Sequence, residues 1–356
     1  MPVTVLSVGY PLAPVAENTA GGAEQILAIL DQGLIEAGED SIVIAPEGSL
    51  CRGTLLAATL PAAPLDDQAH ARACRQYRAA IRSALKQYPV DVVHLHGIDF
   101  LEYLPKSAVP VVVTLHLPLS WYPAETFCLA RPDTYLICVS ESQRAEGPPD
   151  AKACRVIPNG VRLDEYRPAR VKRDYAVALG RVCPEKGFHV ALDAASEAGI
   201  PLVLAGQVFG YQTHAQYFET MIQPRLKGNH RFIGAVGGHE KNELLARARC
   251  LVVPSLVAET SCLVAMEALA SGTPVVAFRR GALTEVVEHG STGLLVDTPS
   301  ELAQAIIEAG KLSSSLCREQ ARQKFSATNM VRSYLSLYHE LAHRTAAPGS
   351  LREQVA

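Results

Sequence analysis

Short apolar runs rich in β-branched residues alternate with helical patterns along the whole chain. Each run is continuously apolar, which is typical of strands buried on both faces of a parallel sheet. Helices between successive strands then act as crossover connections that cover both faces. The predicted strands are Val3–Gly9, Ile42–Ala45, Val90–Leu95, Val109–Leu115, Tyr135–Val139, Arg155–Ile157, Tyr175–Gly180, Pro201–Ala205, Arg231–Ile233, Cys250–Pro254, Pro274–Phe278 and Leu294–Val296.

The number of runs predicts two doubly wound α/β domains. The chain has 356 residues, more than one compact domain usually contains. Twelve strands fit two six-stranded sheets, and the polar stretch 164–174 around Pro168 is the natural break. Aromatic and aliphatic residues then recur at helical spacing towards the end of the chain. We predict Rossmann-like domains over 1–168 and 169–328, a last helix over 329–344 and a tail over 345–356.

Composition narrows the class of protein. A net charge of -3 and a pI near 6.4 give no reason to expect a nucleic-acid surface. No apolar run is long enough to span a bilayer, and Met1 leads directly into a strand, so we expect neither a signal peptide nor firm membrane insertion. The nine cysteines are scattered without a C-x-x-C pair, which indicates a reducing cytoplasm and no zinc site.

Two carboxylates, Glu259 and Glu267, stand eight residues apart around a predicted helix start. The free backbone N–H groups and positive dipole end of a helix suit a phosphate, while a carboxylate accepts hydrogen bonds from sugar hydroxyls. The pair could therefore hold both ends of a nucleotide-sugar. The structural alternatives are a solvated Glu259 and a Glu267 paired with a surface cation, although the small-residue helix around Glu267 favours burial and a need for partners.

Two further loops follow predicted strands and carry anion-binding chemistry. Arg181 and Lys186 lie on one loop, and two cations so close together can neutralise a diphosphate. Gly21 and Gly22 precede a helix, and paired glycines let the backbone approach an anion, although no dinucleotide fingerprint is present. Solvated or merely flexible loops are the alternatives for both. Gly206 could likewise bring backbone close to a phosphate or sugar.

Histidines end two neighbouring predicted strands. His116 at a strand's carboxyl end could bond a sugar hydroxyl or phosphate, or be a satisfied structural histidine. His94 and His96 lie at the end of the preceding predicted strand and have the same two interpretations. A structural role is favoured for His94, and both interpretations stay open for His96. Their spacing could suit a metal, but no third ligand is evident, so no metal is predicted. Asn159 is interpreted as part of a turn between the domains, and Ser140 as a helix cap.

With these motifs assembled, the chain resembles the retaining glycosyltransferases of the GT-B fold, family GT4. The resemblance covers essentially the whole chain, and it is the order and spacing of the motifs that make it specific. The family usually has Phe-Gly where Ser261-Cys262 stand here, and an aspartate is common at the position of Arg162. The matching segments are the Gly21-Gly22 loop, His116, Ile157–Val161, Gly180–Gly187, Glu259–Glu267, Gly272–Ala277, Glu285–Val287 and Gly290–Val296.

The resemblance implies a role for each matching position. Glu267 would hold the ribose and Glu259 the donor sugar, while Arg181 and Lys186 bind the diphosphate without a metal. His116 would lie beside the donor sugar in the catalytic centre, and the last helix would return to the first domain. Residues that would help through the backbone or the loops around the donor are Gly21, Gly22, Gly206, Ser261, Cys262, Leu263 and Val264.

The function expected from this resemblance is retaining transfer of a sugar from a nucleoside-diphosphate sugar, with UDP favoured, to an acceptor hydroxyl. No cofactor is expected beyond that donor substrate. A UDP-sugar 2-epimerase of the same fold and a non-catalytic sugar-nucleotide binding protein are the alternatives. The acceptor is expected to be a soluble small molecule or saccharide, and a homodimer is also considered. Loops 10–20, 52–69 and 117–129 would frame the acceptor, with Trp121, Tyr122 and Phe127 either stacking on it or packing internally.

Overall fold

The chain folds into two compact units, each built around its own sheet. The structure is a computed structural model and describes residues 2–17, 19, 21–59, 66–149 and 154–346. Between the two sheets the chain passes from the first unit to the second after Ile157, whereas the sequence predicts this boundary at residue 168. The predicted tail from 347 on, and parts of two predicted acceptor loops (18, 20 and 60–65), lie outside the described residues. The first unit comprises Met1–Val139, Gly147–Ile157 and Met330–Ala356, and the second comprises Ser140–Glu146 and Pro158–Asn329.

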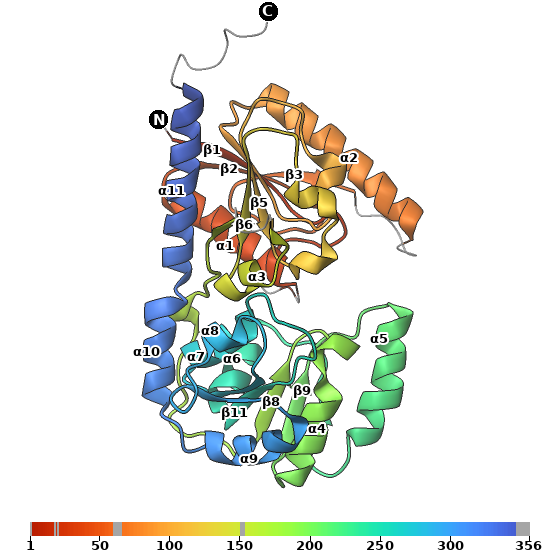
Figure 1. Cartoon of the computed structure of the whole chain (residues 1–356), viewed down its shortest axis with the longest axis vertical. Helices are drawn as coiled ribbons and strands as arrows, with labels where there is room; N and C mark the ends of the chain where they lie inside the picture. The colour runs from red at the N-terminus through yellow and green to blue at the C-terminus, as the bar shows by residue number, and fades with distance from the viewer. Residues whose placement is uncertain (1, 18, 20, 60–65, 150–153, 347–356) are drawn as a thin grey trace, which may run out of the picture. The chain divides into compact units, whose positions relative to one another are not determined.

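The first unit contains one fully parallel sheet of seven strands in the order β3-β2-β1-β4-β5-β6-β7 (Figure 1). From β1 the chain winds outwards in one direction, and from β4 it winds outwards in the other. This reversal of strand order is the hallmark of a doubly wound sheet. The strands are β1 (Thr4–Val8), β2 (Asp40–Pro46), β3 (Thr54–Ala58), β4 (Val92–Leu95), β5 (Val111–Leu115), β6 (Thr134–Cys138) and β7 (Arg155–Val156).

Strand β3 was not among the predicted strands, since 52–69 was interpreted as a loop. Its five residues are all exposed or only partly buried, because β3 pairs with β2 alone and forms the edge of the sheet. Leu55–Ala58 are apolar but include no β-branched residue, and leucine and alanine are strong helix formers, so the strand signal of the central strands is weak here. The first sheet therefore has seven strands rather than six.

Helices cover both faces of this sheet. The long helix α2 (Asp67–Gln87) covers one face. Its Tyr77 and Ile81 side chains belong to the same buried cluster as Val93 and Leu95 of β4. On the other face lie α1 (Gly22–Glu36) and the last helix, α11 (Ala327–Ala346). Gly33 lets α1 and α11 approach closely, because a Cβ there would lie 2.5 Å from the side chain of Val331.

The second unit repeats the same topology with six parallel strands in the order β10-β9-β8-β11-β12-β13. All six coincide with predicted strands to within two residues at each end. Five of them are almost continuously buried, which explains why their sequence signal was clear, while the edge strand β10 is exposed or only partly buried. The strands are β8 (Ala176–Leu179), β9 (Leu202–Ala205), β10 (Arg231–Phe232), β11 (Cys250–Val253), β12 (Val275–Phe278) and β13 (Gly293–Val296).

Alternate residues of these strands point into two separate cores. Val177 and Leu251 face a core shared with α7 and α10, whereas Ala176 and Val252 face a core shared with α4 and α9. Two layers of helices therefore enclose the sheet. The helices of the second unit are α3 (Glu141–Ala145), α4 (Phe188–Glu197), α5 (Gln212–Tyr217), α6 (Gly238–Arg247), α7 (Leu263–Ala270), α8 (Leu283–Val286), α9 (Pro299–Ala309) and α10 (Ser314–Lys324).

A chain of hydrogen bonds joins β4 and β5 to α11 inside the first unit. His94 is fully buried, and its Nδ1 and Nε2 atoms lie 2.7 Å from the Tyr338 hydroxyl and 2.7 Å from Thr114 Oγ1. Thr114 Oγ1 in turn lies 2.8 Å from the Tyr334 hydroxyl. Burial lowers the pKa of His94, so the ring is neutral, with one nitrogen donating and the other accepting. His94 therefore belongs to the core.

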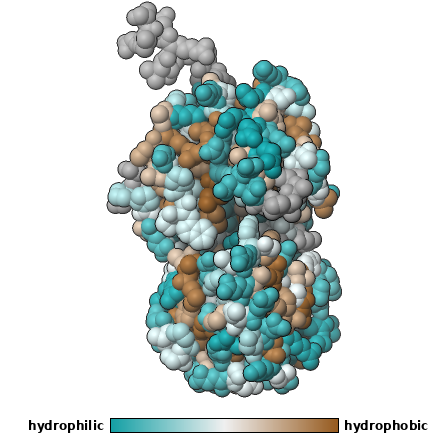
Figure 2. Space-filling view, turned by 90° about the vertical axis from the view of Figure 1, so that its right-hand side faces the viewer, coloured by the Kyte–Doolittle hydropathy of each residue, from teal (hydrophilic) through white to brown (hydrophobic). Residues whose placement is uncertain are grey.

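The surface is mixed in character. Figure 2 shows hydrophilic residues over much of the face in view, with hydrophobic residues between them in small groups. The large apolar side chains that are most exposed, Leu50, Val171 and Tyr211, come from separate segments. Among the described residues, no helix combines the length and apolar character required to cross a membrane.

We predict that Tyr338→Phe destabilises the protein by about 1–3 kcal/mol, because it leaves His94 Nδ1 buried without a partner. Urea unfolding measures this loss. The matched control is Tyr135→Phe, which removes a hydroxyl bonded to Asp133 at an exposed position (3.3 Å) and should cost less than about 0.5 kcal/mol. Equal losses in the two variants would contradict the role given to the His94 network.

Candidate functional site

The second sheet changes winding direction between β8 and β11, which pair side by side. The chain leaves these two strands in opposite directions, and ligands of doubly wound sheets bind beyond the carboxyl ends of the strands at such a point. The loop after β8 contains 180–187, and the loop after β11 contains 254–262. The topology therefore brings together two of the loops singled out in the sequence.

Lys186 and Glu259 face each other across this point. Lys186 Nζ donates to Glu259 Oε1 at 2.6 Å, and the Ser255 hydroxyl donates to the same oxygen. Burial raises the pKa of Glu259, but the Lys186 ammonium more than offsets this effect, and the net pKa is lowered. Burial likewise lowers the pKa of Lys186, while the Glu259 carboxylate brings the net pKa above its ordinary value. Both groups are therefore charged at neutral pH.

Two glycines allow the loops to approach closely enough to form this pair. Gly187 follows Lys186 with a φ of 61°, and a Cβ there would lie 2.3 Å from the Pro254 carbonyl oxygen. Gly281 has a φ of 52°, and a Cβ there would lie 2.4 Å from the Glu259 carbonyl oxygen, which accepts from the Ala282 amide at 2.7 Å. Both positions require glycine for conformation and for space.

Glu267, on α7, is held by a cation that the sequence analysis missed. Lys241 of α6 donates to Glu267 Oε1 at 2.7 Å, and both side chains are almost fully buried. The Tyr166 hydroxyl also donates a hydrogen bond to Glu267. Burial is the main cause of the raised pKa of Tyr166, and the Glu267 carboxylate raises this pKa further. A signal was present, since helical spacing places Lys241 on the same face as the buried Leu245. A charge on a buried face requires a partner.

The start of α7 has an unusual backbone. Cys262 precedes the helix with φ 59° and ψ 65°, the left-handed conformation in which glycine is favoured. Cys262 stands where the resemblance led us to expect the glycine of Phe-Gly. The backbone has the conformation suited to that glycine, although this chain carries a cysteine side chain there. Burial and the neighbouring Glu259 carboxylate raise the pKa of Cys262, so its sulfur is a thiol. The first amides of α7, from Leu263 and Val264, belong to the helical turn that lacks intrahelical partners.

Asn159 also contributes to this helix start, although its sequence pattern indicated only a turn. Its side chain is buried, and Nδ2 donates to Ser261 Oγ at 3.0 Å. Asn159 Oδ1 is buried without a hydrogen-bond partner among the described residues. The Asn159 amide therefore fixes Ser261 immediately before the α7 amides. A Pro-Asn-Gly turn pattern does not distinguish this role from a simple chain reversal.

Arg181 and Gly206 occupy the same edge of the sheet in different ways. Arg181 is exposed, and its charge helps to lower the pKa of Glu259. Gly206 packs against the end of β8, where a Cβ would lie 1.8 Å from the Gly180 carbonyl oxygen. The Gly206 amide donates to the Gly234 carbonyl at 2.7 Å, so close packing accounts for this glycine without a ligand.

The paired glycines of the first unit stand at the start of α1. Gly21 precedes the helix and Gly22 is its first residue. The carboxylate of Glu24 lies directly against Gly21, so a Cβ added to Gly21 would come within 1.8 Å of Glu24 Oε2. A carboxylate at this position opposes a phosphate electrostatically. In the structure as it stands, the Gly21 loop is therefore arranged around its own acidic side chain.

His116 follows β5 and pairs with His96, which follows β4. His96 Nδ1 and His116 Nε2 lie 2.9 Å apart, and the two rings stack with their centroids 5.2 Å apart. Burial lowers the pKa of His116 to about 3, and burial and the neighbouring histidines lower that of His96. His116 is therefore a neutral imidazole that can bond a hydroxyl or phosphate without contributing a charge.

The architecture is shared with solved glycosyltransferases. The crystal structure of AviGT4, a glycosyltransferase involved in avilamycin A biosynthesis, is 26% identical, with a TM-score of 0.69 and 96% of this chain and 98% of that chain covered. HepE of Anabaena in complex with UDP-glucose has the same fold, with 20% identity, a TM-score of 0.73 and 95% and 99% covered. Two doubly wound parallel units of this kind define the GT-B class of glycosyltransferases.

The sequence comparisons identify the family. The model named Glycosyl transferases group 1 matches residues 164–327, and the model named Glycosyltransferase Family 4 matches residues 20–165. The chain therefore belongs to the group 1 glycosyltransferases, family GT4. A putative glycosyltransferase of Bacillus subtilis, YtcC, is 26% identical over 273 residues, covering 65% of this chain and 67% of the relative. Matches to the next curated relatives cover just over half of their length.

We predict that Lys241→Met lowers the free energy of unfolding by about 3–5 kcal/mol, because it leaves the Glu267 carboxylate buried without its cation. Arg247→Met on the same helix is the matched control. It breaks a pair with Glu243 of similar length (2.6 Å) whose side chains are 42% and 44% exposed, and it should cost less than about 1 kcal/mol. Denaturant unfolding that ranks the two losses equally would contradict a dependence of Glu267 on Lys241.

We also predict that Cys262→Gly is more stable than Cys262→Ala by about 1 kcal/mol, because only glycine removes the Cβ from the left-handed conformation. The same two substitutions at Cys250 serve as the control. Cys250 lies in extended β11, where alanine should be more stable than glycine by about 0.5–1 kcal/mol. Thermal and urea unfolding measure both differences. The same sign at both positions would show that Cys262 does not impose this cost.

Proposed function

We propose that the chain transfers a sugar from a nucleoside-diphosphate sugar to an acceptor hydroxyl with retention of configuration. The observation that carries this proposal is the Lys186–Glu259 pair beside the start of α7 at the switch point of the second sheet. A cation and helix amides suit a diphosphate, while a charged carboxylate beside them suits sugar hydroxyls. Family membership supports the same reaction class.

In this proposal Lys186 and Arg181 neutralise the diphosphate, and the amides of 261–264 donate hydrogen bonds to it. Glu267 accepts from the ribose hydroxyls, with Lys241 and Tyr166 holding its carboxylate in place. Lys186 already neutralises Glu259, so an arriving diphosphate competes with Glu259 for the ammonium. Donor binding would then release the Glu259 carboxylate to accept from the hydroxyls of the donor sugar.

The proposed chemistry needs no nucleophile from the protein. The bond between the anomeric carbon and the diphosphate oxygen breaks, and the acceptor oxygen forms its new bond on the same face of the sugar. The leaving phosphate takes the proton of the acceptor hydroxyl. Charge on that phosphate grows in the transition state, so Lys186, Arg181 and the helix amides stabilise this state most. We propose a neutral hydrogen-bonding role in catalysis for His116.

UDP is the proposed nucleotide, and HepE, a protein of the same fold, holds UDP-glucose. For the acceptor we propose a soluble small molecule or saccharide. Of the three aromatic residues considered for stacking, Tyr122 is buried and its hydroxyl accepts from the Leu117 amide at 3.3 Å. Trp121 is 47% exposed and is therefore the better candidate to contact an acceptor.

The test measures nucleotide release from a panel of UDP-, ADP- and GDP-sugars, with and without acceptors, followed by mass spectrometry of the products. We predict that Lys186→Ala and Glu259→Ala each lower kcat/KM by at least about 100-fold, because each removes charge stabilisation or sugar positioning at the reacting centre. Lys311→Ala, at an exposed lysine, is the control and should match the wild type. Near wild-type rates in both site variants would refute the site assignment.

The same assay separates the competing functions. Nucleotide release only when donor and acceptor are both present indicates transfer, and release with donor alone indicates hydrolysis. An epimerised sugar without any acceptor product would indicate a 2-epimerase. Binding of donor with no product of any kind would indicate a non-catalytic sugar-nucleotide binding protein.

A further inference from the structure

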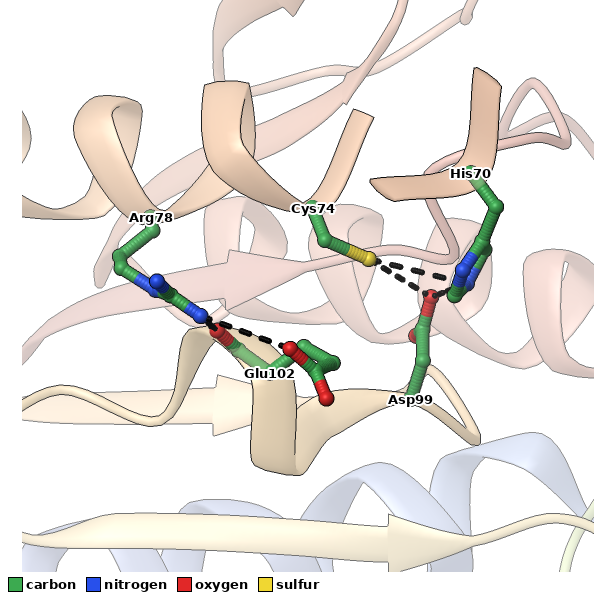
Figure 3. Close-up of polar contacts among 5 residues, drawn as sticks. All are labelled: His70, Cys74, Arg78, Asp99 and Glu102. Carbon is green, nitrogen blue, oxygen red and sulfur yellow. Dashed lines mark hydrogen bonds and ion pairs between the residues drawn. The ribbon is translucent and has the colours of Figure 1, made fainter. Parts of the chain in front are cut away.

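Three side chains with metal-binding chemistry meet in the first unit. His70 and Cys74 lie four residues apart on α2, and Asp99 lies in the loop between β4 and the short helix η1 (Phe100–Tyr103). Figure 3 shows the three side chains converging from these two segments. In the described part of the chain, this is the single group of three such ligands within reach of one ion.

Two of the three distances between the ligand atoms match a tetrahedral zinc site closely. Bonds of about 2.3 Å to sulfur and about 2.0–2.1 Å to nitrogen or oxygen, at tetrahedral angles, separate the ligand atoms by about 3.4–3.6 Å. Cys74 Sγ lies 3.6 Å from His70 Nε2 and 3.5 Å from Asp99 Oδ2. His70 Nε2 and Asp99 Oδ2 are 2.8 Å apart, in hydrogen-bond contact, and would separate by about half an ångström around an ion.

The surroundings hold the ligands in place. Asp66 caps the start of α2 by accepting from the Ala69 amide at 2.7 Å, which fixes the turn that carries His70. The Tyr103 hydroxyl donates to Asp99 Oδ1 at 2.7 Å, so the other carboxylate oxygen is directed towards His70 and Cys74. A hydrogen bond of this kind to a ligating carboxylate is typical of metal sites.

The cluster is open to solvent on one side. The His70 side chain is 36% exposed, whereas those of Asp99 and Cys74 are nearly buried, so solvent reaches the cluster from the His70 side. Glu102, the other carboxylate labelled in Figure 3, is paired with Arg78 at 3.5 Å. A water molecule is therefore the natural fourth ligand. One thiolate, one imidazole and one carboxylate together favour Zn²⁺ over the hard cations Mg²⁺ and Ca²⁺.

The alternative of a cysteine nucleophile fits less well. Cys74 and His70 both bond the same oxygen of Asp99, so the histidine is not placed between the thiol and the carboxylate. Burial, followed by the charge of Asp99, raises the pKa of the Cys74 thiol to about 12. Without a cation the thiol is thus protonated and unreactive.

We propose that His70, Cys74 and Asp99 form a Zn²⁺ site that fastens the amino-terminal turns of α2 to the loop after β4. The scattered cysteines had indicated no zinc site, because two of the ligands are spaced as H-x-x-x-C on a helix and the third is distant in sequence. None of the three ligands is among the residues proposed for sugar transfer, and the proposal of a metal site does not depend on that function.

The test uses the full-length protein after chelation and dialysis. We expect calorimetric titration with Zn²⁺ to show one ion per chain and a raised Tm, with no effect of Mg²⁺. Substituted Co²⁺ should give a thiolate charge-transfer band that Cys74→Ser lacks and Cys128→Ser, at an exposed cysteine, retains. His70→Ala and Asp99→Asn should weaken Zn²⁺ binding by more than about 100-fold, and Tyr103→Phe by about tenfold.

His239→Ala, at an exposed histidine, is the matched control for His70→Ala and should bind Zn²⁺ as the wild type does. Because His70 is partly exposed, its variant tests the site even if Cys74→Ser folds poorly. The absence of stoichiometric Zn²⁺ binding to the wild type would overturn the proposal. Undiminished binding by folded His70→Ala would overturn it equally.

Discussion

Parallel strand pairing is the constraint on which both units depend. Because neighbouring strands run in the same direction, each connection returns across a face of the sheet, and the loops that follow the strands gather at one edge. In the second unit this brings Lys186, after β8, to Glu259, after β11, although 73 positions separate them in sequence. The site is thus a product of topology before any side-chain chemistry is considered.

Buried charge distinguishes this edge from the rest of the second unit. Isolated burial of a carboxylate is costly, and a lysine partner offsets much of that cost. Glu259 and Glu267 have each acquired such a partner, Lys186 and Lys241, from a different loop or helix. The two pairs differ in exposure: 25% of the Lys186 side chain is accessible against 9% for Lys241. The proposed exchange of Glu259 for a diphosphate therefore involves the more accessible lysine, whereas Lys241 is held in a buried pair.

The sequence was most informative where burial is continuous. The central strands were predicted to within a few residues, whereas the half-exposed edge strand β3 is apolar but has no β-branched residue after Thr54. Lys186 and Glu259 could be singled out because each follows a strand, but their direct pairing could not, since it depends on tertiary contact. The roles of Lys241 and Asn159 could not be recognised from the sequence for the same reason, because their partners, Glu267 and Ser261, are distant in sequence. Gly206 is accounted for by packing that only the folded backbone reveals.

The hydrogen bond between His94 and Tyr338 spans 244 positions of the chain. During synthesis the first sheet leaves the ribosome long before α11 exists, so His94 and Thr114 lack their tyrosine partners while the whole second unit is made. The second unit, whose sheet is contiguous in sequence, can fold first. Completion of the amino-terminal core therefore waits for the carboxyl-terminal helix, which reverses the usual order in which domains mature on the ribosome.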